Sequence, residues 1–168
     1  AGCVVELARG AAAQALFQQA LDDWRVMTAA ALVGLARRAQ AIAIEYVKER
    51  HQFGVPIGSF QTIAHRLADI ATEVDGIELL ARKAAWSSDE QTNNIGRLAC
   101  MALLFAAQTA ERVCAESLHF HGGYGFTLEY DIQLLFRRAK AWPLVFGSLA
   151  DEELELAARI VGPSEEIA

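Results

Sequence analysis

Apolar residues recur in steps of three and four along most of this chain, and that spacing constrains its fold more than any other feature. The steps run through residues 32–46, residues 60–81 and residues 98–113. Residues three and four apart share one face of an α-helix. The sequence therefore predicts an all-α protein with over two thirds of its residues in helix and no sheet.

Glycine, proline and polar clusters set the expected ends of the long helices. The first is expected over about 12–50 and the third over about 94–118. Ser59 is a candidate N-cap for the second, which should end near residue 86, because serine accepts a hydrogen bond from the first turn. Residues 87–93 then read as a polar connection.

Two shorter helices should complete the fold. One is expected over residues 128–140, and the other from near Ser148 to before Gly162. Long helices with short connections form antiparallel up-and-down bundles. We expect such a bundle over residues 11–168.

The first residues do not fit this bundle. Residues 3–7 read Cys-Val-Val-Glu-Leu, the pattern of a short strand, and nothing nearby could pair with it. We expect residues 1–10 to be the remnant of a preceding β domain.

Composition excludes several classes of function. The net charge of -6 argues against nucleic acid as a partner, because binding it needs a basic face. The most apolar run, residues 98–107, is about half the length that spans a bilayer, so we expect no membrane partner. Cys3, Cys100 and Cys114 are too few for a disulfide framework and indicate reduced thiols, hence a cytoplasmic protein.

Metal chemistry has little support in the sequence. Residues 116–119 read Glu-Ser-Leu-His, a spacing found in di-iron helical bundles, but those need a second copy and the sequence has none. His119 and His121 have no cysteine or carboxylate at the usual zinc-ligand spacing. We expect no metal site.

Two loops carry more chemistry. Residues 50–54 read Arg-His-Gln-Phe-Gly, in which Arg50 could pair with a phosphate and Phe53 could stack on a flat ring. Residues 121–126 read His-Gly-Gly-Tyr-Gly-Phe, and glycines at a helix boundary let a phosphate approach backbone N–H groups. A solvated arginine, a core phenylalanine and a simple helix stop are the alternatives.

Together the two loops resemble those of the acyl-CoA dehydrogenase family. The resemblance covers about residues 20–162 and only the C-terminal helical domain of that family. It implies that the Arg-x-x-Phe-Gly loop binds the adenosine diphosphate half of an FAD held by a neighbouring subunit. Arg50 would then lie at the pyrophosphate, with Phe53 and Gln61 on the adenine-ribose side.

Three further segments carry the resemblance. Gly122 and Gly123 begin a loop similar to the family's Gly-Gly-x-Gly-Phe loop, which also lies against the FAD, and His119 stands where the family usually has a glutamine. Asp22 and Arg25 resemble an Asp-x-x-Arg pair that approaches the acyl-CoA. Residues 137–140 read Arg-Arg-Ala-Lys, similar to the family's Arg-Asp-Ala-Lys.

The chain departs from the family at the catalytic base. Family members remove a proton from Cα of an acyl thioester with a glutamate, while hydride leaves Cβ for the flavin. That glutamate usually stands just before a Gly-Thr or Gly-Ser, where this chain has Phe146. In some relatives it lies on the first long helix, where this chain has Trp24. Neither side chain can accept a proton, so we expect no catalytic residue here.

The resemblance implies a consistent function. Some bacterial members of the family, of the steroid-degrading type, are heterotetramers in which one chain supplies the base and the other lacks it. We expect an FAD-dependent subunit of the second kind, with an acyl-CoA substrate and an electron-transfer flavoprotein or similar acceptor. The alternatives are a homo-oligomeric enzyme with a relocated base, for which Asp22 and Asp23 are candidates, and a flavin-free structural scaffold.

Overall fold

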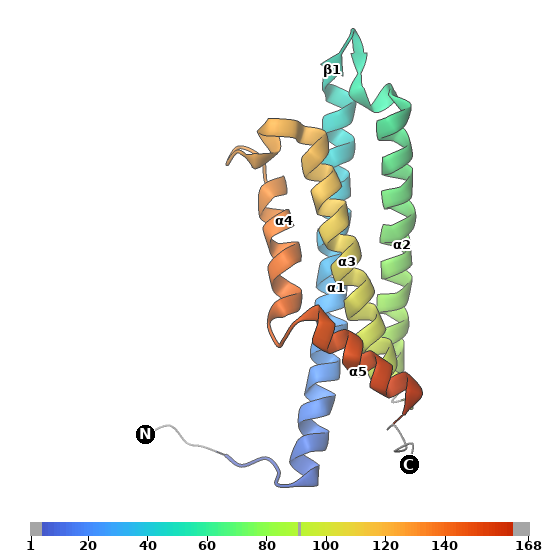
Figure 1. Cartoon of the computed structure of the whole chain (residues 1–168), viewed down its shortest axis with the longest axis vertical. Coiled ribbons are helices and arrows are strands. Elements are labelled where there is room, and N and C mark those ends of the chain that lie inside the picture. The colour runs from blue at the N-terminus through green and yellow to red at the C-terminus, as the bar shows by residue number, and fades with distance from the viewer. Residues whose placement is uncertain (1–4, 91, 163–168) are drawn as a thin grey trace, which may run out of the picture.

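Helices running up, down and up again form the body of the molecule (Figure 1). The computed structural model describes residues 5–90 and 92–162. Within those residues the α-helices are α1 (Ala11–Glu49), α2 (Gln61–Asp89), α3 (Ile95–His121), α4 (Ile132–Ala141) and α5 (Leu149–Val161). α4 lies beside α1 and α3, and α5 crosses the lower end of the bundle. The prediction of an all-α bundle is confirmed.

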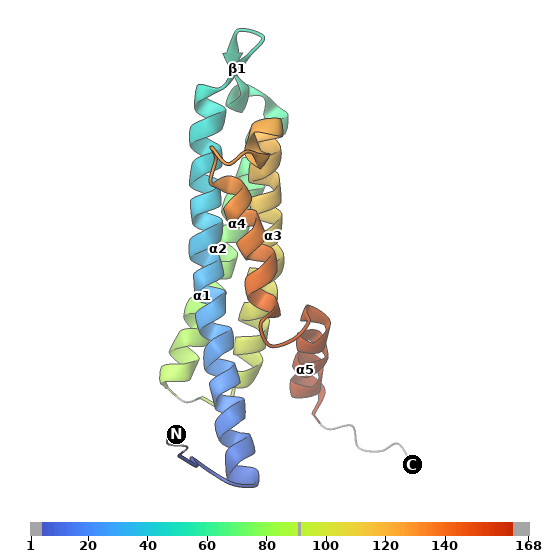
Figure 2. The same cartoon turned by 90° about the vertical axis from the view of Figure 1, so that its left-hand side faces the viewer.

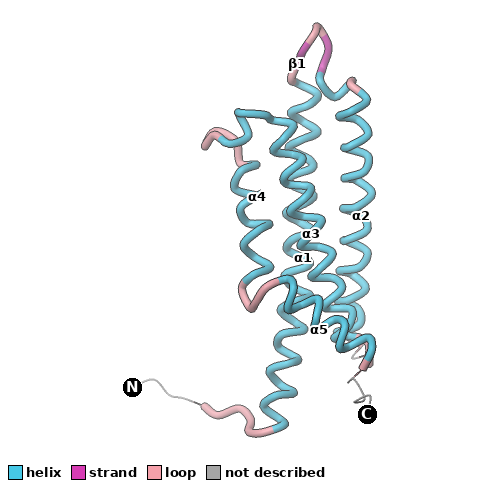
Figure 3. Tube along the Cα trace, in the orientation of Figure 1, coloured by secondary structure: helices cyan, strands magenta, loops and turns pink. Residues whose placement is uncertain are grey.

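Five short elements connect the helices. They are β1 (His51–Gln52), β2 (Val55–Pro56) and the 3-10 helices η1 (Ile57–Ser59), η2 (Gly122–Phe126) and η3 (Trp142–Leu144). The strands pair antiparallel and form a small hairpin above the bundle (Figure 3). The prediction of no sheet was therefore wrong. Phe53 and Gly54 both have positive φ, of 54° and 83°, which is the backbone that a two-residue hairpin turn requires.

Two expected helix starts were wrong. Ser59 is not the N-cap of α2, because it lies within η1 and its hydroxyl donates to the carbonyl of Pro56 at 2.7 Å. Phe60 takes the cap position with extended backbone. α4 begins at Ile132 instead of residue 128, because residues 127–131 form a turn before it.

Other helix ends lie near their expected positions. α2 continues to Asp89, so the polar connection after it is shorter than predicted. α3 ends at His121, where Gly122 has a φ of 59° that favours glycine. Ser148 caps α5, since its hydroxyl accepts from the N–H of Asp151 at 3.2 Å and the Asp151 carboxylate accepts from the N–H of Ser148.

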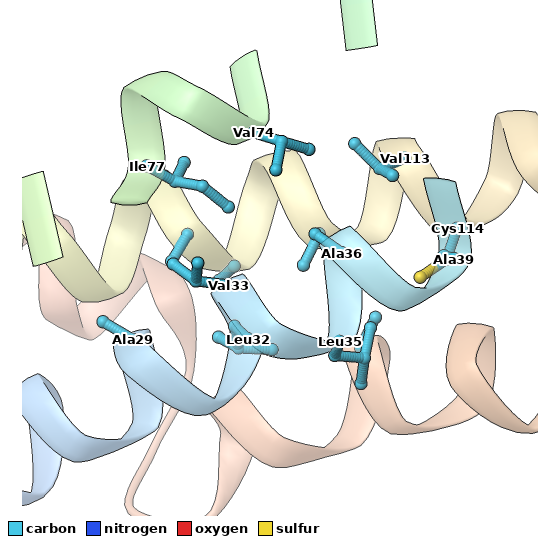
Figure 4. Packing of buried hydrophobic residues seen from close by; sticks show 14 of the residues in the cluster. Ala29, Leu32, Val33, Leu35, Ala36, Ala39, Val74, Ile77, Val113 and Cys114 are labelled. Atoms are coloured by element: carbon cyan, nitrogen blue, oxygen red, sulfur yellow. The ribbon is translucent and has the colours of Figure 1, made fainter. Parts of the chain in front are cut away.

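α3 is the central helix. It contacts α1, α2, α4 and α5 and has more buried residues than any other described helix. Figure 4 shows its Val113 and Cys114 facing the apolar side chains of α1, with Val74 and Ile77 of α2 beside them. Leu32 of α1 is fully buried. Truncating such a leucine to alanine costs about 2–5 kcal/mol, so this core holds the three long helices together.

Two helices are long and apolar enough, by length and composition alone, to cross a membrane. They are Ala11–Glu49 and Ile95–Phe126, and the apolar window of the second is 67% buried inside the fold. Core helices of bundles meet the same test. The short apolar run at residues 98–107 therefore does not decide whether a helix could cross a membrane. The absence of a membrane partner stays a prediction.

The chain before α1 has no helix or strand from Val5 to Arg9. A strand was expected over residues 3–7. Residues 5–7, which the structure describes, do not form a strand, because no neighbouring strand pairs with them. Residues 3 and 4 lie outside the described residues. Figure 2 shows the first turns of α1 extending past the lower end of the bundle, opposite the hairpin.

Candidate functional site

The two loops singled out in the sequence meet at the upper end of the bundle. They border a hollow of about 400 Å³ between the ends of α1 and α3. The lining includes four of the six residues predicted to bind the cofactor, namely Arg50, His119, Gly122 and Gly123.

Arg50 is held by its backbone and left open at its side chain. Its N–H donates to the carbonyl of Tyr46 at 2.9 Å, and its own carbonyl accepts from Ile57 at 2.7 Å, which closes the hairpin. The guanidinium carbon lies 5.9 Å from the centre of the Tyr124 ring. An exposed guanidinium beside an aromatic face can still pair with a phosphate, which is the contact predicted for it.

The glycine loop offers backbone rather than side chains. A Cβ atom at Gly122 or Gly123 would meet nothing within 4 Å, so both residues leave open space at the hollow. Gly125 differs, because a Cβ there would lie 2.9 Å from the carbonyl oxygen of Leu118. The loop therefore packs on α3 at Gly125 and presents bare backbone to the hollow at Gly122 and Gly123, as phosphate binding requires.

The other two predicted cofactor residues lie outside the lining. Phe53 is at the hairpin tip, 93% exposed, with its ring centre 6.3 Å from that of Phe60. Gln61 is exposed at the first position of α2. Both side chains lie outside the hollow, and their predicted contacts with the adenine-ribose side of FAD stay predictions.

The hollow is also lined by Tyr46, which was expected only as a member of an apolar stripe, and by His121, which opens the predicted glycine loop and was otherwise considered as a zinc ligand. Their rings stack with centres 4.1 Å apart. They lie 75 residues apart in the sequence, and no local pattern connects them.

A second candidate site lies lower, between α1 and η3. It is an apolar groove of about 600 Å³ whose lining includes Trp24, Met27, Trp142 and Val145. Phe146 is edge-on to Trp24, with ring centres 4.9 Å apart and planes at 82°. The two residues at the expected base positions thus touch each other. Among the described residues that line the groove, Asp23 has the single carboxylate.

Asp22 and Arg25, predicted to approach the substrate, lie in a buried ion-pair network instead of an open site. Arg25 donates through Nε to Glu152 at 2.7 Å and through Nη1 to Asp22 at 2.6 Å. Its Nη2 also reaches Glu152, at 3.1 Å, so all three nitrogens are used inside the fold. Asp22 also pairs with Arg159 at 3.0 Å. The network joins α1 to α5.

Burial and pairing oppose each other in this network. Burial alone lowers the pKa of the Arg25 guanidinium, but its hydrogen bonds to Glu152 and Asp22 outweigh that, and the pKa is raised. Arg25 therefore stays charged. Gly96 lies against this network, since a Cβ there would overlap the guanidinium of Arg159. The predicted substrate role of Asp22 and Arg25 stays a prediction, and the structure gives them a role in holding α5.

No metal centre is formed by the described residues, since no group of three or more potential ligands gathers among them. The Glu116 carboxylate, considered above with His119, is paired with Arg66 of α2.

Comparisons with known proteins agree with this arrangement. Residues 14–161 match the family described as acyl-CoA dehydrogenase, C-terminal domain. The probable acyl-CoA dehydrogenase YngJ of Bacillus subtilis (strain 168) is 37% identical over 145 residues, which are 86% of this chain and 38% of YngJ. This chain thus spans well under half the length of such relatives.

Solved structures give the same result. Butyryl-CoA dehydrogenase from Megasphaera elsdenii superposes with a TM-score of 0.82 at 32% identity, covering 86% of this chain and 37% of that one. A chain of the ChsE4-ChsE5 complex from Mycobacterium tuberculosis gives 0.77 at 28% identity, covering 83% of this chain and 38% of its own.

Proposed function

This chain belongs to the acyl-CoA dehydrogenase family, whose C-terminal helical domain it represents, and we propose on that premise that it is the base-lacking subunit of a heteromeric, FAD-dependent enzyme. One observation carries the proposal. Trp24 and Phe146 occupy both positions where the family resemblance expects the base, and they pack on each other in an apolar groove. The hollow at the upper end meanwhile keeps its exposed arginine and bare glycine backbone.

The upper and lower ends of the bundle then have separate roles. Arg50 neutralises a diphosphate, and the backbone at Gly122 and Gly123 lies against it. The groove beside Trp24 excludes water from an apolar acyl group. Bound FAD would supply the acceptor for the hydride that leaves Cβ. A carboxylate of the unlike partner would accept the proton that leaves Cα.

Relatives support the partners in this proposal. One similar structure is the ChsE4-ChsE5 complex, and another is described as the Tcur3481-Tcur3483 steroid ACAD. A third relative, from Acetobacterium woodii, is subunit CarC of a caffeyl-CoA reductase-Etf complex, 33% identical over 141 residues. We therefore propose a related acyl-CoA dehydrogenase chain as the subunit partner and an electron-transfer flavoprotein as the acceptor.

A turnover assay on the full-length protein tests the proposal. The chain purified alone should not oxidise an acyl-CoA, and the complex with its co-purified partner should. Phe146→Leu should leave the complex active apart from a packing loss, since Phe146 transfers no proton. Changing the partner's candidate glutamate to glutamine should lower the rate about 100-fold or more. Ordinary turnover by the yellow, full-length chain alone would overturn the heteromer.

A second candidate function rests on Asp23. Its carboxylate borders the groove, is exposed, and accepts from the Ser88 hydroxyl at 3.2 Å, while Asp22 is occupied by the buried network. If the chain is self-sufficient, Asp23 is its base. Asp23→Asn should then remove activity, whereas Asp69→Asn, an exposed carboxylate on α2, should not. Full activity of Asp23→Asn would exclude this candidate.

A further inference from the structure

An aromatic cluster fills the space behind the upper hollow. The His121 ring stacks on Tyr46 at 4.1 Å with planes 24° apart, and Tyr130 meets His121 edge-on at 5.4 Å. Tyr130 also meets Tyr46 edge-on at 6.0 Å. His121 is therefore clamped between one ring from α1 and one from the turn before α4. Offset and edge-on ring pairs attract each other beyond the effect of their buried area.

The clamp joins the two groups that would face a phosphate. Tyr46 lies one helical turn before Arg50 and accepts the Arg50 N–H at its carbonyl, at 2.9 Å. His121 is the last residue of α3 and directly precedes Gly122. The Tyr46 hydroxyl donates to the His121 carbonyl at 3.4 Å. The contact between Tyr46 and His121 therefore fixes the distance between the end of α1 and the start of the glycine loop.

The glycine loop also folds back onto His121. A Cβ at Gly125 would lie 3.0 Å from the Cβ of His121 and 2.9 Å from the Leu118 carbonyl oxygen. The next contact outward is Tyr124, whose ring lies under the Arg50 guanidinium at 5.9 Å. Movement of His121 would therefore shift both the loop backbone and the ring beside Arg50.

Stability alone does not explain a histidine at this position. Nδ1 lies 2.7 Å from the Ser117 carbonyl, which can only accept, so Nδ1 carries the proton and this bond fixes the tilt of the ring. Nε2 is buried and has no hydrogen-bond partner among residues 5–90 and 92–162, and the residue is 2% exposed. An unpaired buried polar atom destabilises the folded state. A purely structural site would favour an apolar ring.

We propose that His121 is a positioning residue for the cofactor, which sets the Gly122–Gly123 backbone and the Arg50 guanidinium at the separation that the diphosphate of a dinucleotide requires. The inference rests on the proposed function, which makes FAD the ligand of this hollow. His121 does not itself touch the diphosphate. It acts through Tyr46 on the arginine side and through Gly125 on the glycine side.

A double-mutant cycle on the assembled, full-length complex tests the proposal. The dissociation constant of FAD is measured by flavin fluorescence after removal and re-addition of the cofactor, for wild type, Arg50→Ala, His121→Leu and both together. Arg50→Ala should weaken binding about 10- to 100-fold, because a charge-assisted phosphate contact is lost. His121→Leu should weaken it about 10-fold. The double variant should bind more tightly than the product of the two single effects predicts, because residues that act as one unit are not additive.

Two controls separate positioning from simple loss of stability. Ile77→Ala removes a buried side chain from the middle of α2, far from the loops, and should leave FAD affinity unchanged below its unfolding temperature. His121→Phe keeps a ring on Tyr46 and loses the Nδ1–H bond, so its affinity should fall between those of wild type and His121→Leu. If His121→Leu does not fold, the cycle is run with His121→Phe.

The outcomes also separate this inference from the proposed function. Wild-type affinity in the His121 variants, or an effect that multiplies with that of Arg50→Ala, would overturn the positioning role while the FAD site stands. Wild-type affinity in Arg50→Ala as well would overturn the FAD site itself, and with it this inference.

Discussion

The two ends of the bundle differ in what they offer to a ligand. At the upper end, an arginine side chain and the backbone of two glycines are exposed. At the lower end, the arginine is paired with carboxylates, and aromatic rings line the groove. Arg50 and Arg25 show the difference. Both stand in motifs that suggest ligand binding, but Arg50 is exposed and all three nitrogens of Arg25 are used by Glu152 and Asp22. The same residue type is therefore left open to solvent or holds a helix according to its neighbours.

The difference has a functional consequence. The upper end can bind an anion, because it offers an exposed cation and the bare backbone of two glycines at one hollow. The lower end offers an apolar groove with no proton acceptor at Trp24 or Phe146. In the heteromer proposed above, such a chain would contribute to cofactor binding, and its partner would supply the carboxylate.

The largest expected effect comes from opening the lower network. Arg25→Met leaves the buried Glu152 carboxylate without its cation and should lower the free energy of unfolding by about 3–5 kcal/mol. Urea denaturation followed by circular dichroism measures this. Arg38→Met, an exposed position on the same helix, is the matched control and should change stability by less than about 0.5 kcal/mol.

A second variant tells whether charge or shape matters there. Replacing Arg25 and Glu152 together by Met and Leu removes both charges and should recover most of the lost stability, since apolar pairs of similar volume substitute well for buried ion pairs. A cost below about 1 kcal/mol for Arg25→Met alone would mean that the network is solvated, and the contrast with Arg50 would disappear.

An intermediate effect should distinguish two glycines of the upper loop. Gly125→Ala places a methyl group 2.9 Å from a backbone oxygen of α3, which cannot move without shifting the helix. We expect a loss of about 1–3 kcal/mol in thermal or urea unfolding, the usual cost of overpacking. Gly123→Ala meets open space and should cost less than about 1 kcal/mol. Equal costs would show that the loop does not rest on α3 at Gly125.

Local patterns predicted the helices and the loops but not the contacts between distant segments. The three- and four-residue steps specify α1, α2 and α3 directly, because helix periodicity is written in neighbouring residues. The resemblance suggested Arg50, His119, Gly122 and Gly123, and the structure places all four around one hollow.

What the sequence could not predict depends on tertiary packing. Arg25 and Glu152 are 127 residues apart, and the stack of Tyr46 on His121 joins different helices, so neither pair has a local signature. Ser59 was misplaced because a 3-10 turn competes with the cap it was expected to form. The hairpin was missed because two paired residues in each strand give no measurable alternation.

The smallest effect compares two cysteines of α3, Cys100 beside the lower network and Cys114 in the apolar middle. Burial raises the pKa of the Cys114 thiol from 9.0 to about 12. Burial also raises the pKa of Cys100. The positive charges of Arg25 and Arg159 offset part of this rise, so that the pKa is about 11. Thiols of the unfolded chain ionise near pH 9, while the folded chain keeps both protons. Their contribution to stability is therefore complete below pH 9 and declines as the pH rises toward 11 and 12.

Thiolate absorbance at 240 nm, measured in a Cys3→Ser background, should show Cys100 ionising at lower pH than Cys114. The variants Cys100→Ser and Cys114→Ser assign the two steps. Arg159→Met should move the Cys100 step upward, toward that of Cys114. If Cys100 ionised at or above the pH of Cys114, Arg25 and Arg159 would not be lowering its pKa, and the electrostatic contrast between the two halves of α3 would be wrong.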